Sequence, residues 1–462
     1  MTAIHYLGAL LVIVLIMGLG MYSGSRVKSA SDFAGHSRKA GAGIVAGTII
    51  GTLVGGASTI GTAQLAFNFG FSAWWFTLGG GLACLILALF YAKPLYESGL
   101  NTIPQILSQE YGRRVATTAM ILTSLGSFLS IVSQVLSSIA LVTSVSSVPS
   151  GVATVTTLAL MIAYVLFGGL WGAGLVGIAK TLLLSLAVGA CGLMALNLQG
   201  GWSGFTSVLP ADRFFSLVAR GPAVDLGAGF SLVLGMLSTQ AYIQAVISSR
   251  SLKLSRAGVL VSAAVIPLIG VAGIVVGLYM RINFPDINPA GALPLFVLKF
   301  LPPLLAGMVL ATLLVSVVGT AAGVALGISS MFCADIYSVY RKSAGPANML
   351  LVSRITLACI LTAAALVSLG NLGSLILSWS FMSMGLRGAV ACGVLSLALF
   401  LPGRIPANYA FWSMIVGPVC ILIGKPLLGS IIDPLFIGVA GSLAVLLAGY
   451  LREKKVAVPK CF

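Results

Sequence analysis

Two cations inside long apolar segments are the residues of this sequence best suited to act on a bound molecule. Arg387 lies near the middle of the segment 373–401, and Lys180 lies within the segment 172–197, closer to one end. A guanidinium fork matches a carboxylate with two parallel hydrogen bonds. We expect Arg387 either to contact an anionic solute or to be held by carbonyl groups and water. Lys180 is expected either to extend to the nearest surface or to act beside a cation site.

The acidic residues, by contrast, all lie in loops or at the ends of apolar segments. Without a deep carboxylate, a proton relay of buried acids is not expected, and a cationic solute would lack a buried counter-charge. The nine are Asp32, Glu97, Glu110, Asp212, Asp225, Asp286, Asp335, Asp433 and Glu453.

No arrangement of residues indicates an enzyme or an organic cofactor. His5 and His36 are peripheral, and the seven cysteines are scattered without a C-x-x-C pair. Neither a metal-ligand cluster nor a nucleophile beside a base stands out. The cysteines are expected to be small buried apolar side chains.

The composition places these residues in a membrane protein. Hydrophobic residues make up 59% of the chain and charged residues 7%, and the mean hydropathy is +1.11. A soluble domain carries about 25% charged residues. Apolar runs of roughly 20 residues, the length of a membrane-spanning helix, recur without the alternation of barrel strands. We therefore expect an all-α integral membrane protein with about 13 transmembrane helices. The expected spans are 3–23, 42–68, 72–92, 117–144, 151–167, 172–197, 226–249, 257–281, 303–333, 350–369, 373–401, 406–428 and 433–451.

The positive charge is distributed as a topology signal. Alternate connections carry most of the lysines and arginines, and such loops stay in the cytoplasm. We expect a multi-pass inner-membrane protein whose N-terminus is outside and whose C-terminus is cytoplasmic, and nucleic acid is not needed to explain the net charge of +16. The cytoplasmic set is Arg26, Lys28, Arg38, Lys39, Lys93, Arg113, Arg114, Arg250, Lys253, Arg256, Arg341, Lys342, Arg354, Arg404, Arg452, Lys454, Lys455 and Lys460. The outer set is Arg213, Arg220, Arg281 and Lys299, with Lys425 close to that side.

The spans form an approximate inverted repeat within a single domain, 1–462. Residues 42–197 and 226–401 hold five spans each, and an odd number reverses the orientation of the second unit. Each unit begins with a glycine-interrupted span, which in transporters indicates a broken helix at the binding site. Close helix packing through small residues is the alternative. The glycines are Gly41, Gly43, Gly47, Gly51, Gly55, Gly56 and Gly61 in the first unit, and Gly227, Gly229 and Gly235, followed by Ser238, Thr239 and Gln240, in the second.

A few uncharged polar residues lie deep enough to contact a solute. Gln64 and Gln240 carry most weight, because each lies just beyond a presumed helix break. Such residues also join helices to one another, so each alone indicates little. The candidate solute contacts are Ser58, Gln64, Thr77, Gln134, Thr239, Gln240 and Arg387, and Ser133 and Tyr242 lie at similar depth.

The motifs together resemble the sodium:solute symporter family over nearly the whole chain. The resemblance implies the LeuT-type fold, with one extra helix (3–23) before the ten-helix core and two (406–451) after it. It rests on Gly55-Gly56-Ala57-Ser58-Thr59-Ile60-Gly61, Gly70-Phe71-Ser72-Ala73-Trp74-Trp75, Thr102-Ile103-Pro104, Glu110-Tyr111-Gly112, Phe167-Gly168-Gly169-Leu170-Trp171, Gln240 with Gln244, Leu293-Pro294 and Asp335-Ile336-Tyr337.

The resemblance also implies a sodium site made of the backbone carbonyls of Gly51 and Val54 with Ser316, Gly319 and Thr320. Ser316 and Thr320 are four residues apart, so both hydroxyls lie on one helix face and could complete a neutral oxygen cage for a hard cation. The alternative is that each hydroxyl bonds its own i−4 carbonyl. Gly319 departs from the family's usual hydroxyl residue and removes one ligand.

A second departure concerns the next helix. Where the family usually has a Thr-Asp pair, this chain has Val176 and Gly177, with Lys180 one turn later. A second sodium ion is therefore not expected there. The leading hypothesis is sodium-coupled symport of a small organic solute, a carboxylate or zwitterion, by alternating access, with sodium as the coupling ion. The alternatives are proton-coupled or sodium-independent transport with Lys180 replacing a cation, and a membrane solute sensor.

Overall fold

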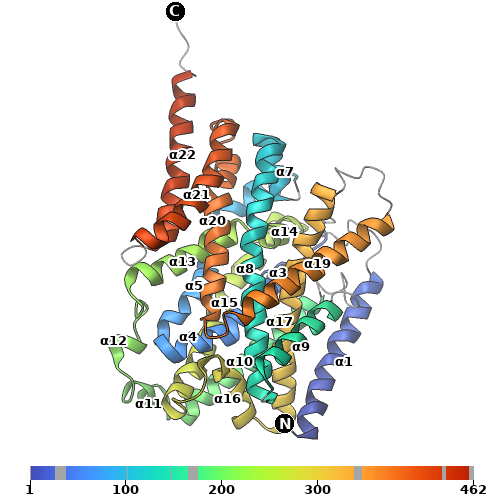
Figure 1. The fold of residues 1–462 in the computed structure, drawn as a ribbon, viewed down its shortest axis with the longest axis vertical. Helices are drawn as coiled ribbons and strands as arrows, with labels where there is room; N and C mark the ends of the chain where they lie inside the picture. Colours follow the sequence, from blue (N-terminus) through green and yellow to red (C-terminus); the bar gives the residue numbers. More distant parts are fainter. Residues whose placement is uncertain are drawn as a thin grey trace, which may run out of the picture.

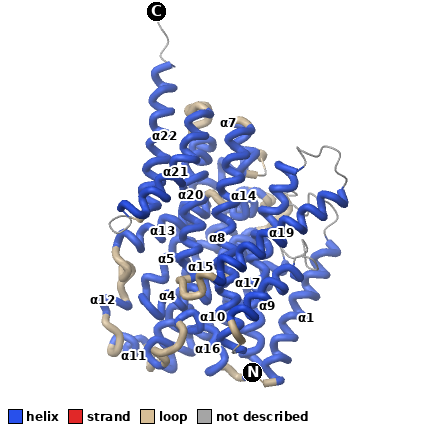
Figure 2. Tube along the Cα trace, viewed as in Figure 1, coloured by secondary structure: helices blue, strands red, loops and turns tan. Residues whose placement is uncertain are grey.

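The computed structural model describes residues 2–26, 38–100, 102–146, 148–164, 175–337, 346–428 and 433–456, and almost all of them are helical. Figure 2 shows helices joined by short loops. Nine helices in the described part of the chain are long and apolar enough to cross a membrane, and a bent pair makes a tenth. The chain is a multi-pass, all-α membrane protein, as its composition predicts.

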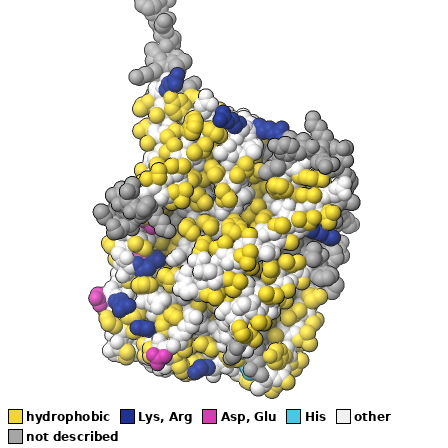
Figure 3. Space-filling view, viewed as in Figure 1, with side chains coloured by type: hydrophobic (Ala, Val, Ile, Leu, Met, Phe, Trp, Pro, Cys, Tyr) yellow, Lys and Arg dark blue, Asp and Glu magenta, His cyan; other side chains and the backbone are white. Residues whose placement is uncertain are grey.

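The surface and the two ends of the bundle agree with a membrane environment. Helix α1 (Ala3–Arg26) begins at the bottom of Figure 1, and α22 (Pro434–Val456) ends at its top. Hydrophobic side chains cover most of the flank in Figure 3. On α1, for example, Leu10 and Val14 are 55% and 59% exposed. Contiguous apolar surface of this kind is unfavourable in water and favourable in lipid.

The first half of the chain forms one broken span and four further helices that reach across the bundle. The broken span consists of α3 on one side of Val54–Gly56 and of η1 with α4 on the other. The elements are α3 (Ala42–Leu53), the π-helical turn η1 (Ala57–Gly61), α4 (Thr62–Phe69), η2 (Gly70–Trp74), α5 (Trp75–Ile86), η3 (Leu87–Tyr91), α6 (Ala92–Glu97), the surface helix α7 (Ile103–Tyr111), α8 (Arg113–Ser146), α9 (Ser150–Ala163) and α10 (Leu175–Leu198).

The turn between α4 and α5 requires glycine. Gly70 has φ +61°, in the region that other residues avoid, and a Cβ atom there would collide with the Phe214 carbonyl. Only glycine combines this conformation with such a close approach of backbone. The chain can therefore reverse sharply into α5 instead of continuing the span.

The second half repeats the pattern of a broken span followed by long helices. It contains α11 (Trp202–Thr206), α12 (Ala211–Phe214), α13 (Pro222–Leu237), α14 (Gln240–Ile247), α15 (Leu252–Asn283), η5 (Pro289–Gly291), α16 (Ala292–Phe300), α17 (Pro303–Met331), η6 (Phe332–Tyr337), α19 (Pro346–Leu369), α20 (Ile376–Phe400), α21 (Ala407–Leu428) and α22. The pair α13 and α14 is bent by 49° at Ser238–Thr239.

The expected spans and surface helices match the observed elements. Each expected span contains a helix or a broken pair whose bounds differ by a few residues from the prediction. The sequence also predicts short surface helices from Thr102 to Gln109 and from Pro289 to Lys299, which correspond to α7 and to η5 with α16. The motif Phe167-Gly168-Gly169-Leu170-Trp171 lies outside the described residues.

Candidate functional site

The break after α3 is held open by side chains that replace the missing helical hydrogen bonds. Val54 leaves the helical conformation, with φ −83° and ψ 91°. The N–H of Gly55 donates to Ser58 Oγ over 2.9 Å, and the N–H of Gly56 donates to Gln134 Oε1 of α8, also over 2.9 Å. All of these residues are buried or nearly so. Backbone that lipid would penalise is therefore satisfied inside the bundle.

Helix α17 brings two hydroxyls to this break. Ser316 Oγ donates to the Val54 carbonyl over 3.2 Å, and Thr320 Oγ1 donates to the Ser316 carbonyl over 2.8 Å. Thr320 thus makes the i−4 bond that the sequence left as an alternative, whereas Ser316 reaches across to the broken helix. The structure brings together three of the five residues that the resemblance assigned to a sodium site.

Lys180 of α10 points into the same place. Its Nζ donates to Thr320 Oγ1 over 2.8 Å and to the Ser316 carbonyl over 3.2 Å. The side chain is 7% exposed, so it does not extend to the surface of the bundle. We refer to Lys180 Nζ, the Val54 and Ser316 carbonyls and the hydroxyls of Ser316 and Thr320 as the cage.

The two remaining residues of the expected sodium site are glycines at its edge. A Cβ atom on Gly51 would lie 3.0 Å from Thr181 Oγ1 and 3.2 Å from the Gly177 carbonyl, so Gly51 lets α3 approach α10. A Cβ atom on Gly319 would lie 3.2 Å from the hydroxyl of Tyr164. The space that the usual hydroxyl residue would need is therefore bordered by a tyrosine hydroxyl from the end of α9, which sequence reasoning missed.

The second break, between α13 and α14, receives Arg387 from α20. Arg387 Nη1 donates to Thr239 Oγ1 over 3.0 Å. Nε and Nη2 donate to the carbonyl and hydroxyl of Ser383 over 3.2 and 2.9 Å, and Nη2 also contacts Met384 Sδ at 3.3 Å. The arginine is 5% exposed. Its partners in the described part of the chain are all neutral.

Packing fixes Arg387 closely. A Cβ atom on Gly126 of α8 would lie 2.6 Å from Arg387 Cγ, so this glycine makes room for the arginine stem. Ser383 Oγ donates to the Gly126 carbonyl over 2.6 Å and so holds α20 to α8. Four hydrogen bonds leave one of the five guanidinium N–H groups for another acceptor.

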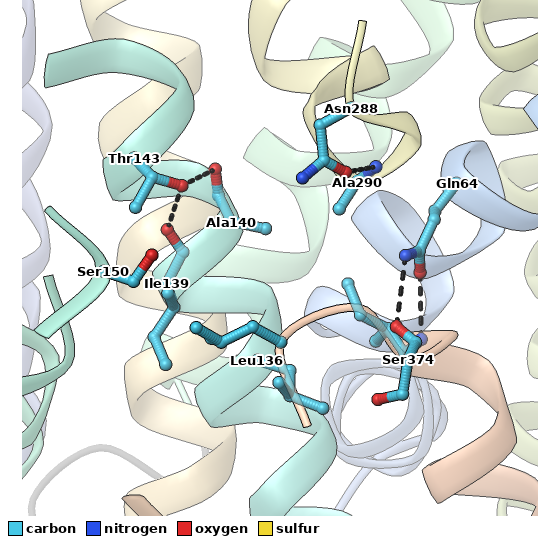
Figure 4. Close-up of a pocket in the computed structure, with 11 residues that line it drawn as sticks. Gln64, Leu136, Ile139, Ala140, Thr143, Ser150, Asn288, Ala290 and Ser374 are labelled. Atoms are coloured by element: carbon cyan, nitrogen blue, oxygen red, sulfur yellow. Dashed lines mark hydrogen bonds between the residues drawn. The ribbon is translucent and has the colours of Figure 1, made fainter. Parts of the chain in front are cut away.

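Gln64 lies in the first turn of α4 and joins it to the loop before α20. Its Nε2 donates to the Ser374 carbonyl over 3.3 Å, and its Oε1 accepts from the Ile376 N–H over 2.9 Å. Figure 4 shows this pair of bonds beside a cavity of about 60 Å³, which Thr143 and Asn288 also line. We refer to this pair of bonds as the Gln64 latch.

The other candidates occupy different places. Gln240 Oε1 accepts from the Ile103 N–H over 2.8 Å and so joins α14 to the surface helix α7. Thr77 donates to the Trp74 carbonyl over 3.3 Å and packs against Gly270 of α15. The structure therefore brings Ser58 and Gln134 to the first break and Thr239 and Arg387 to the second, and it places Thr77 against α15.

One buried ion pair was not expected from the sequence. Arg220 Nε lies 2.7 Å from Asp225 Oδ1, and Ser72 Oγ lies 2.5 Å from the same oxygen. Asp225 is fully buried in the first turn of α13, and its Oδ2 accepts from the Arg220 N–H over 2.9 Å. The Arg220 guanidinium lies 5.7 Å from the centre of the Phe381 ring. The available signal in the sequence was the arginine Arg220 followed closely by the carboxylate of Asp225, just before the expected span 226–249.

Known proteins resemble this chain in sequence and in fold. The model of the sodium:solute symporter family matches residues 33–417. The sodium/sialic acid symporter SiaT of Proteus mirabilis is 26% identical, over 98% of this chain and 94% of that protein. The human high affinity choline transporter 1 is 27% identical, over 77% of this chain and 66% of that protein. The solved structure of a Na+-coupled sialic acid symporter, in a substrate-bound outward-open state, shares the fold with a TM-score of 0.75 and 22% identity over 99% of this chain and 98% of that one.

The family match spans most of the chain, and the solved structure shares its fold over nearly the whole length. The fold is the LeuT-type fold of two inverted five-helix units, with the extra helices that the sequence predicts. This chain belongs to the sodium:solute symporter family, and it is a secondary transporter of the membrane rather than an enzyme.

Proposed function

We propose that this chain carries a small organic anion, a carboxylate or a zwitterion, in symport with sodium. The solute binds between the two helix breaks, where Gln134 and Ser58 lie at one break and Thr239 and Arg387 at the other. Membership of the sodium:solute symporter family supports coupling to sodium. The charge of the site supports the choice of an anion.

The observation that carries the proposal is the buried guanidinium of Arg387 with neutral partners only. A charge at this depth costs at least ~2.5–3.5 kcal/mol on insertion scales. Each of its described partners is a hydroxyl, a carbonyl or a thioether. The remaining N–H belongs to Nη1, the nitrogen that bonds Thr239, so a carboxylate at the break could accept from this nitrogen and could also replace the Thr239 hydroxyl as its partner.

The relatives supply opposite test solutes. The bacterial relatives are named for sialic acid, and the animal relatives for choline. The carboxylate of an acid could pair with the charge of Arg387, whose described partners are neutral. A quaternary ammonium would be repelled by that charge and would have no carboxylate among the described partners to pair with. The site therefore favours the acid.

Alternating access requires that the site be closed from each side in turn. The Gln64 latch closes one side, between α4 and the start of α20. On the other side, residues 40 and 249 pair as a short bridge, and Arg250 Nε donates to the Lys39 carbonyl over 2.6 Å. We assign the latch to the outer side and the bridge to the cytoplasmic side of an inner membrane, with the N-terminus outside. Labelling of introduced cysteines should find residue 28 accessible from the cytoplasm and residue 213 accessible from outside. Residue 28 outside together with residue 213 in the cytoplasm would reverse this assignment.

A second candidate is transport by the same fold without sodium, with Lys180 supplying the cation. The observation that favours it is the position of Lys180 Nζ, within hydrogen-bonding distance of two oxygens of the cage. In this second candidate function, a gradient other than the sodium gradient, such as a pH gradient, drives uptake.

Uptake into proteoliposomes tests both candidates. The panel contains labelled sialic acid, short carboxylates, amino acids and choline, each with and without inward sodium and pH gradients. Sodium-stimulated uptake of an acid supports the first proposal, and acid uptake that follows only the pH gradient supports the second. Uptake of choline with rejection of every acid would refute the anionic substrate.

A further inference from the structure

We propose that the ammonium of Lys180 takes the place of a metal ion in the cage, as a cation fixed to the chain, so that sodium does not bind there. This inference rests on the proposed function only in that the chain is a cation-coupled transporter. It holds whether sodium bound elsewhere or another gradient drives the cycle.

The oxygens of the cage are suited to either kind of cation. A carbonyl and a hydroxyl present lone pairs that a hard metal ion or an ammonium can take. Thr320 Oγ1 donates its own proton to the Ser316 carbonyl, so its lone pairs are free to accept from Lys180 Nζ. The hydrogen-bond directions in this part of the chain are thus consistent with an ammonium as the central cation.

A sodium ion would compete for the same oxygens. Lys180 Nζ lies 2.8 Å from Thr320 Oγ1, a group that the resemblance gave to sodium, and 3.2 Å from the backbone carbonyl of Ser316, whose hydroxyl the resemblance also gave to sodium. Two positive charges at contact distance repel strongly where water is excluded. No acidic side chain is recorded in contact with the cage among the described residues, so nothing offsets that repulsion. The residues present fit the fixed cation, and they do not fit a sodium ion beside it.

The position of Lys180 gives the fixed cation a structural role as well. Its stem comes from α10, its hydrogen bonds go to α17, and Ser316 continues to the Val54 carbonyl at the break after α3. The ammonium therefore joins α10 to α17, and Ser316 joins α17 to the broken helix. Unlike a metal ion, the lysine side chain cannot leave into either compartment, so no metal ion crosses the membrane from the cage.

The decisive variant vacates the cage. Lys180→Met removes the charge and keeps the length of the side chain, and Lys180→Arg keeps the charge. Purified full-length protein in detergent is titrated with sodium at constant ionic strength, with potassium replacing sodium. Binding of radiolabelled sodium and the sodium-induced shift in melting temperature are both measured.

We expect Lys180→Met to bind one more sodium ion per chain than the parent and Lys180→Arg to bind no more than the parent. In the Lys180→Met background, Ser316→Ala or Thr320→Ala should abolish the added sodium. Thr312→Ala is the matched control, because Thr312 lies one turn before Ser316 on α17 and, among the described residues, its hydroxyl bonds the Met308 carbonyl alone, over 2.8 Å. This control should leave the added sodium in place.

The parent chain supplies a second test that does not depend on the folding of a lysine variant. Ser316→Ala and Thr320→Ala in the parent should change the half-saturating sodium concentration for uptake by less than about twofold. A rise of about tenfold or more in either variant, or the absence of added sodium in folded Lys180→Met, would overturn the inference.

These results are separate from the test of the proposed function. Acid uptake that needs no sodium removes sodium symport, yet it leaves the inference standing if Lys180→Met gains a sodium ion. Sodium-driven uptake that is weakened by Thr320→Ala removes the inference and leaves sodium symport standing.

Discussion

At the break after α3 the ammonium of Lys180 arrives from α10, and at the break after α13 the guanidinium of Arg387 arrives from α20. The hydrogen bonds of the lysine all go to another helix. Those of the arginine go mainly to Ser383 and Met384 on its own helix, and only Nη1 reaches the break. A compact cation that bridges helices closes its site. Arg387 is held by residues of its own helix, and its Nη1 presents a donor at the break to an entering solute.

A third buried cation gives this comparison a reference. Arg220 is paired with Asp225 over 2.6 Å, whereas Lys180 and Arg387 have neutral partners. The full pair has no unmet charge, so we assign it to holding the start of α13 rather than to a solute. The comparison therefore distinguishes Arg220, whose charge is paired and whose role is structural, from Arg387, whose charge an anionic solute could pair.

The largest effect is expected from breaking that reference pair. Asp225→Asn leaves the Arg220 side chain, which is only 10% exposed, without its counter-charge. Loss of one partner of a buried pair costs about 3–5 kcal/mol, so the melting temperature of the purified protein should fall steeply. Asp212→Asn is the control, because Asp212 is exposed in the first turn of α12. Equal stability of the two variants would contradict the structural assignment of Arg220.

Substitutions of Arg387 should lower the affinity for anionic solutes and not only the stability of the protein. Arg387→Lys keeps the charge and loses the fork, and a lost charge-assisted hydrogen bond of ~1.5–3 kcal/mol weakens anion binding roughly tenfold to a hundredfold. Arg387→Gln should be worse for acids and should spare a neutral solute. Affinity is measured beside the amount of folded protein.

The control for Arg387 is Arg281→Gln, since Arg281 lies in the last turn of α15 and its guanidinium is 5.3 Å from the Phe67 ring. It should leave affinity unchanged. If both Arg387 variants lower only the amount of folded protein, the arginine is structural and the proposed anion loses its main support.

The Gln64 latch should give a smaller effect on access to the site. Gln64→Leu removes two hydrogen bonds of ~1 kcal/mol each, which shifts the closed state toward the open one by roughly tenfold to thirtyfold. A cysteine introduced at Thr143, which lines the adjacent cavity, should react correspondingly faster with a membrane-impermeant thiol reagent.

Asn68→Leu is the matched control for the latch, because Asn68 lies one turn further on α4 and its side chain donates to the backbone carbonyl of Gln64, over 3.3 Å, which is not part of the latch. An equal increase in both variants would mean that loss of local helix packing, rather than the latch, opens the cavity.

The sequence could predict the spans and the helix breaks because both depend on local composition. Apolar runs define the spans, and Gly55, Gly56 and the Ser238-Thr239 pair lie where the helices are interrupted. The resemblance supplied the pairing of Val54 with Ser316, which spacing alone could not have supplied. The assignment of these residues to sodium stays a prediction that the experiments above test.

Contacts between distant helices could not be predicted. Whether Lys180 extends to the surface or inward depends on the rotation of α10 against α17, which hydropathy does not specify. Gln64 was chosen for its depth, yet its partners lie more than 300 residues away in a loop. The predicted position of a residue along its span therefore identified the buried polar residues. Only the three-dimensional packing distinguished those at the helix breaks from those that join helices.

The smallest effect is expected at Thr77, and it sharpens the comparison because Thr77 and Thr239 were equal candidates in the sequence. Thr239→Val removes the hydroxyl that accepts from Arg387 Nη1, so anion affinity should change by several-fold as the guanidinium loses its contact at the break. Thr77→Val keeps the shape of the side chain and removes only a bond to the Trp74 carbonyl, on a face packed against Gly270. Its affinity should stay within about twofold of the parent, with a stability loss of ~1 kcal/mol. Uptake affinity and melting temperature are measured for both variants in parallel. A loss of affinity in Thr77→Val as large as that in Thr239→Val would extend the solute site to α5, and would mean that a position at a helix break is not what selects the solute contacts.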